Sequence, residues 1–81
     1  MPTLEDIQNA CAVPLKGARA YARVKLEANL ELAFIRTNGR RNEPLEAWYI
    51  TTQTDNLRID ESQALTLLAL RTDDEILTLR Q

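Results

Sequence analysis

The stretch from Ala18 to Phe34 alternates between apolar and other side chains, and this alternation limits the possible folds most strongly. Every even-numbered position in it is apolar, whereas the odd positions mostly carry Arg, Lys, Glu, Tyr or Asn. On a helix, residues two apart are separated by about 200°, so the apolar residues would scatter around the cylinder. On a strand they line one face. Helix propensities differ by only tenths of a kcal/mol per residue, so the pattern predicts strands despite a helix-favouring composition.

A single strand of this length would extend for roughly 55 Å, which is too long for a chain of 81 residues. The stretch is therefore expected to fold back as a hairpin. A three-residue loop over 27–29 keeps the even positions on one face, and Asn29 suits the left-handed conformation that such loops use. This register places Val24 opposite Leu32 and predicts an ion pair between Lys25 and Glu31 on the other face.

Turn-forming residues then separate the hairpin from a further strand. The segment from Asn38 to Pro44 contains Asn-Gly and Pro, which favour a loop. The segment 45–53 is expected to return as a third strand, with Phe34 near Trp48 and Leu32 near Ile50. The residues 53–56 then indicate a connecting turn.

Helix signals lie at the two ends of the chain. Thr3 is a candidate N-cap, followed by apolar residues at helical spacing up to Cys11. In the segment 59–71, Asp60 and Gln63 form a capping-box pattern. Thr72 and Glu75 repeat such a pattern, and a short helix carrying Ile76, Leu77 and Leu79 is favoured there over a terminal strand.

Together these elements predict an α+β fold in the order α-β-β-β-α, with a further short helix at the end. The three strands would form one antiparallel sheet, and the helices would cover its even-numbered face to give two layers. The length allows a single domain over residues 1–81.

The residue types argue against catalysis and cofactor binding. The chain has no histidine, the commonest general base and zinc ligand, and its single cysteine cannot form an intramolecular disulfide or a thiolate cage. Cys11 falls on the apolar side of a predicted helix and is expected to be a small buried hydrophobe. The acidic residues 73–75 stand where a first helical turn favours acids. We therefore expect a non-enzymatic protein without a metal or small-molecule cofactor.

The charges are unevenly distributed along a nearly neutral chain. Between Val13 and Asn42 seven basic residues face two acidic ones, a net charge of +5, whereas the segments before and after carry −2 and −5. Either the segments neutralise one another in the fold, or a basic face is offered to an acidic partner. No signal peptide or membrane-spanning segment is apparent, and a single cysteine suits a reducing compartment, so a cytoplasmic location is expected.

The odd-numbered sheet face is the predicted binding surface, extended by the arginines of the following loop. Tyrosine and arginine often anchor protein interfaces, and an exposed half-apolar face favours a partner. We therefore expect a regulatory or inhibitory protein that binds another protein or a second copy of itself. A nucleic acid is the alternative partner, because basic side chains interleaved with aromatics can grip phosphates and stack on bases. The candidate residues are Arg19, Tyr21, Arg23, Lys25, Ile35, Arg40, Arg41 and Tyr49.

The predicted element order resembles that of the double-stranded RNA-binding domain over most of the chain. Members of that family typically carry a lysine-rich motif at the start of the last helix. Here that place reads Asp60-Glu61-Ser62, which would repel phosphates, so no binding residue carries over. The compact layout is also similar to that of small phage-encoded inhibitors of bacterial defence, a likeness of topology alone.

Overall fold

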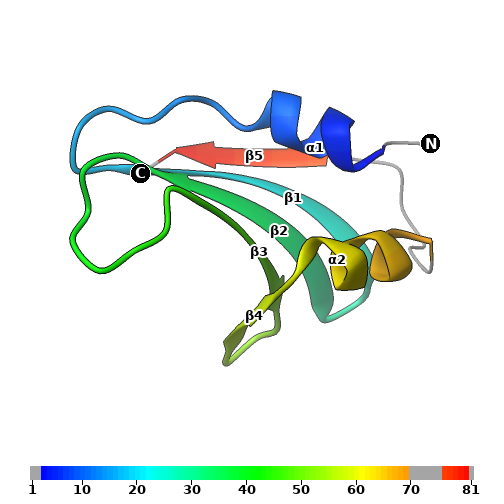
Figure 1. The fold of residues 1–81 in the computed structure, drawn as a ribbon. Coiled ribbons are helices and arrows are strands. Elements are labelled where there is room, and N and C mark those ends of the chain that lie inside the picture. Colours follow the sequence, from blue (N-terminus) through cyan, green and yellow to red (C-terminus); the bar gives the residue numbers. More distant parts are fainter. Residues whose placement is uncertain (1–2, 70–75, 81) are drawn as a thin grey trace.

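The computed structural model describes residues 3–69 and the backbone of residues 76–80. It has an α+β fold in which two helices pack on one face of a five-stranded antiparallel sheet (Figure 1). The strands are ordered β4-β3-β2-β1-β5 across the sheet. The elements in chain order are α1 (Leu4–Ala10), β1 (Arg19–Glu27), β2 (Leu30–Thr37), β3 (Glu46–Thr51), β4 (Asn56–Ile59), α2 (Glu61–Leu68) and β5 (Ile76–Arg80).

The β1–β2 hairpin confirms the predicted register but closes differently. Val24 lies opposite Leu32 and Lys25 opposite Glu31, as expected. The three-residue loop is wrong, because Glu27 pairs with Leu30 across a two-residue turn and the register shifts between Lys25 and Glu27. A β-bulge inserts the extra residue into the strand itself. The bulge therefore keeps the even-numbered residues of both strands on one face, as a three-residue loop would have done. Asn29 does not adopt the left-handed conformation expected for that loop, because its φ is not positive.

The predicted third strand is also confirmed. Strand β3 pairs antiparallel with β2, with Phe34 opposite Trp48 and Leu32 opposite Ile50. The Phe34 and Trp48 rings are 4.8 Å apart between centroids and tilted by 52°, an arrangement that aromatic pairs favour. The register thus brings the largest side chains of the two strands together on the even-numbered face.

The expectation of three strands is wrong, since the sheet has two more. The residues after β3 form a tight turn, in which the Thr52 backbone N–H donates to the Asp55 carbonyl oxygen at 2.9 Å. This turn leads into β4, which pairs with β3 and places Arg58 opposite Tyr49. The segment read as a simple connection to the last helix is therefore a second hairpin.

The short helix expected near the C-terminus is also wrong where the structure describes it. Ile76–Arg80 forms β5, which pairs antiparallel with β1 from Val24 opposite Ile76 to Ala20 opposite Arg80. Without β5, the long strand β1 would leave a row of unpaired backbone groups at the sheet edge. The proposed cap residues Thr72 and Glu75 lie outside the described residues.

Both of the other helix starts are confirmed in detail. The Thr3 hydroxyl accepts a bond from the Asp6 N–H, and the Asp6 carboxylate accepts one from the Thr3 N–H. Asp60 and Gln63 exchange the same two bonds at the start of α2. Helix α2 is shorter than predicted, because its last helical residue is Leu68.

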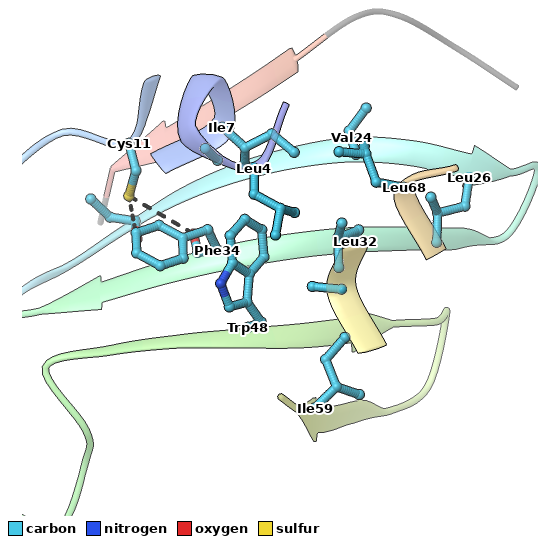
Figure 2. Close-up of a cluster of buried hydrophobic side chains, with 13 residues drawn as sticks. Leu4, Ile7, Cys11, Val24, Leu26, Leu32, Phe34, Trp48, Ile59 and Leu68 are labelled. Carbon is cyan, nitrogen blue, oxygen red and sulfur yellow. Dashed lines mark hydrogen bonds between the residues drawn. The ribbon is translucent and has the colours of Figure 1, made fainter. Parts of the chain in front are cut away.

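The core lies between the helices and the even-numbered face of the sheet, as Figure 2 shows. Leu4 and Ile7 of α1 and Ala64 and Leu68 of α2 pack there against the strands. Cys11 is buried in this cluster, and its thiol donates to the Ala20 carbonyl oxygen at 3.4 Å. The prediction of a buried, structural cysteine is confirmed. The largest fully buried side chains are those of Phe34, Ile7, Leu26, Leu32 and Val24.

Candidate binding face of the sheet

Neither α1 nor α2 packs on the second face of the sheet, because both contribute to the core on the other side (Figure 1). We call this surface the open face. The strand pairings place on it the odd-numbered residues of β1 from Arg19 to Lys25, those of β2 and β3, and the even-numbered residues of β4. Among the described side chains its members include Arg19, Tyr21, Arg23, Lys25, Glu31, Ala33, Ile35, Thr37, Ala47, Tyr49, Thr51, Asn56 and Arg58.

The open face is strongly basic. Its described side chains include four basic residues and one acidic residue, Glu31, a net charge of +3. The predicted cross-strand position of Lys25 opposite Glu31 is confirmed, but their side chains form no ion pair. The Glu31 carboxylate lies 3.1 Å from the Arg23 guanidinium instead, and it also accepts a bond from the Thr51 hydroxyl at 3.4 Å. Lys25, Arg19 and Arg58 form no ion pair with the described residues.

Small apolar residues form a buried floor in the middle of this face. Ala33 is fully buried, and Ile35 and Ala47 are only 8% and 7% exposed. Since neither α1 nor α2 packs on this face, neighbouring residues of the sheet and of the loop after β2 must shield them. Tyr49 is paired with Ala33, and Tyr21 with Ile35. The structure therefore places Ile35 beneath the surface, whereas the sequence predicted that it would be exposed there.

Two arginines of the open face are held close to the sheet. The Nε atoms of Arg19 and Arg23 are shielded from solvent and have no hydrogen-bond partner among the described residues. Both side chains are only partly exposed. An arginine whose inner nitrogen is buried has little freedom to swing away, so its terminal nitrogens remain near the floor.

A hollow of about 340 Å³ opens at one end of the open face. Ile35 and Ala47 lie at its floor, Arg19 lines it from β1, and Tyr49 and Arg58 line it from β3 and β4. Thr37, Asn42, Glu43, Pro44 and Asn56 complete the lining. The hollow therefore combines an apolar floor with cationic side chains from two strands.

The predicted arginines of the loop after β2 differ in their roles. The Arg40 guanidinium lies 2.9 Å from the Glu43 carboxylate and also donates to the Gly17 carbonyl oxygen at 2.9 Å. Arg40 is thus engaged in holding the loop against the segment before β1. Arg41 is exposed and forms no ion pair with the described residues.

Sequence reasoning missed Arg58, which belongs to the same surface. The available signal was its alternation with Leu57 and Ile59, but four residues are too few to distinguish a strand from the start of a helix. Of the eight predicted residues, strands β1, β2 and β3 bring together six on the open face: Arg19, Tyr21, Arg23, Lys25, Ile35 and Tyr49.

The described residues offer little for metal or nucleophilic chemistry. They contain no group of three or more His, Cys, Asp or Glu side chains placed to hold a metal ion. Burial raises the pKa of the Cys11 thiol, although the nearby Arg36 acts in the opposite direction. A buried thiol with a raised pKa is a poor nucleophile.

Comparison with known proteins finds no match to a protein-family model, a curated protein or a solved structure. Within the part of the chain that the structure describes, no helix is long and apolar enough to cross a membrane.

Proposed function

We propose that this protein is a small, non-catalytic regulatory or inhibitory protein that binds an acidic surface of another protein through the open face. The observation that supports this most directly is the combination of two tyrosines with three cations that form no ion pair among the described residues, on a sheet face that neither α1 nor α2 covers. Antiparallel sheets commonly leave one face to solvent.

The proposed division of roles follows from the chemistry of the side chains. Tyr21 and Tyr49 offer large, rigid contact areas that lose little conformational entropy on binding. Arg19, Lys25 and Arg58 supply the complementary charge, which accelerates association and selects an acidic partner. Because the residues stand on paired strands, the partner would meet a surface that is already ordered.

The test is affinity capture with quantitative mass spectrometry on matched variants. Tyr21→Ser and Lys25→Glu each alter the open face, whereas Lys16→Glu makes the same charge change in the exposed turn before β1. We expect a specific partner to be retained by the wild type and Lys16→Glu, and lost by the two open-face variants. Its capture should weaken as salt rises. Retention by all variants equally would contradict the proposed surface.

Self-association is tested on the same variants. Size-exclusion chromatography with light scattering would detect a dimer, and its loss in Tyr21→Ser would make a second copy the partner. A dimer that persists in both open-face variants would place self-association elsewhere on the molecule.

Single-stranded nucleic acid is a second candidate partner, favoured by the aromatic and basic residues that share the open face. Sheet-borne aromatics can stack on bases while arginine and lysine contact phosphates. Fluorescence anisotropy with labelled single-stranded DNA and RNA tests this, with affinity expected to fall steeply as salt rises. Lys25→Glu should weaken such binding. No binding to either oligonucleotide at low salt would remove this candidate.

A further inference from the structure

We propose that the hollow over Ile35 and Ala47 is a subsite for one acidic side chain of the partner, with its carboxylate held between Arg19 and Arg58. This inference rests on the proposed function and names the part of the open face that selects the partner. The ligand class is a carboxylate carried on an apolar stem, as in glutamate or aspartate within a protein segment.

The size of the hollow suits one or two side chains. Its volume of about 340 Å³ lies at the lower end of the range for small-molecule sites. An apolar stem can rest on Ile35 and Ala47, which are buried at the floor. The carboxylate would then lie beside the guanidinium groups of Arg19 and Arg58, which both line the hollow.

The charge around the hollow favours an anion. Its charged lining consists of Arg19, Arg58 and Glu43. Glu43 is neutralised by Arg40 at 2.9 Å, whereas Arg19 and Arg58 form no ion pair with described residues. Guanidinium groups bind carboxylates through paired hydrogen bonds in a planar arrangement. The side-chain amides of Asn42 and Asn56 offer further donors.

The lining is held in place before any partner arrives. Arg19 and Arg58 stand on strands of the sheet. The loop wall is tied to β2, because the Thr37 hydroxyl donates to the Pro44 carbonyl oxygen at 2.7 Å and the Thr37 N–H donates to that of Leu45 at 2.9 Å. Little ordering is then required on binding, which benefits even a weak contact.

The first test uses phenylacetate as the probe, followed by two-dimensional NMR of the ¹⁵N-labelled protein. We expect concentration-dependent shifts centred on the amides of Ile35, Ala47 and Arg58. Phenylacetamide, which has the same ring without the charge, should bind about tenfold more weakly. Equal binding of the two compounds, or shifts spread away from the hollow, would overturn the proposal. Phenyl phosphate binding more than about tenfold tighter than phenylacetate would also overturn it, in favour of a phosphate ligand.

The second test uses variants that alter the hollow alone. Ala47→Leu fills it without changing charge, and Ala69→Leu adds the same atoms at an exposed position after α2. Arg58→Gln removes one cation from the rim. We expect Ala47→Leu to abolish phenylacetate binding, Arg58→Gln to weaken it about fivefold, and Ala69→Leu to leave it unchanged. Unchanged binding in Ala47→Leu, with the fold intact by NMR, would refute the subsite.

Partner capture by four variants distinguishes a failure of this inference from a failure of the proposed function. Neither Tyr21 nor Lys25 lines the hollow. A partner whose capture depends on those two residues but withstands Ala47→Leu and Arg58→Gln would leave the proposed function standing and overturn the subsite. A partner insensitive to all four changes would overturn both.

Discussion

Replacing one aromatic residue on each face of the sheet with alanine should lower the free energy of unfolding by very different amounts. The comparison tests which face is the core and which is open. Phe34 is 2% exposed and packs on Trp48 at 4.8 Å, with the Arg36 guanidinium 5.2 Å from its ring centroid. Phe34→Ala removes this burial and leaves a cavity, which costs about 3–5 kcal/mol. Tyr49 is only partly buried on the open face, so Tyr49→Ala should cost about 1 kcal/mol.

These costs are large relative to the total stability. At roughly 0.05–0.15 kcal/mol per residue, a chain of 81 residues has an unfolding free energy of about 4–12 kcal/mol. With a urea m-value of about 1 kcal/mol per molar, Phe34→Ala should lower the midpoint by about 3–5 M and Tyr49→Ala by about 1 M. If Phe34→Ala is unfolded without urea, Phe34→Leu provides a smaller, measurable loss.

The assay is urea unfolding followed by the fluorescence of Trp48, the only tryptophan in the chain. Because Phe34 touches that reporter, far-ultraviolet circular dichroism should be measured on the same samples. A loss for Tyr49→Ala that equals or exceeds the loss for Phe34→Ala would refute the reasoning, since the open face would then carry a core of its own.

Two further predictions concern the N-terminal and C-terminal parts of the core. Burial raises the pKa of the Cys11 thiol above its ordinary value, so the folded state favours the neutral thiol. The resulting contribution to the unfolding free energy is fully present below the ordinary pKa and is lost as pH rises from there through the raised pKa of the folded state. Unfolding free energies measured from pH 7 to 10 should fall more steeply for the wild type than for Cys11→Ala, and equal slopes would contradict the prediction. Asp60→Ala removes the cap of α2 and should cost about 0.5–2 kcal/mol in urea unfolding. Asp60→Asn should restore most of this loss, and a failure to do so would indicate that the charge rather than the cap matters.

The alternation of residue types was sufficient to predict β1, β2 and their register, because one shift would move every apolar residue to the wrong face. Burial of Val24 and Leu32 and the position of Lys25 on the opposite face all agree with one register. The turn could not be predicted in the same way. A two-residue turn with a bulge and a three-residue loop preserve the same faces, so the pattern does not distinguish them.

The two strands that were not predicted, β4 and β5, are too short for the local sequence pattern to identify them. Strand β4 spans four residues, Asn56–Ile59, directly before a strong helix cap at Asp60. Strand β5 pairs with β1 across more than fifty positions of the sequence. Whether the edge of β1 is available for pairing depends on the tertiary fold, so the local sequence does not show it. A segment of five residues such as Ile76–Arg80 can satisfy a helical or an extended pattern, so its partner decides between them.

The open face shows that a pattern predicts which side a residue faces but not how deeply it lies. Ile35 was correctly placed opposite the helices, yet it is 8% exposed. Its neighbours across the sheet are Tyr21 and the small residue Ala47. Ile35 and Ala47 both line the hollow, whereas Tyr21 does not. The methyl group of Ala47 is too short to fill the space beside Tyr49, so the hollow stays open in the part of the face that Arg19 and Arg58 also line, and the alternation of residue types alone does not predict it.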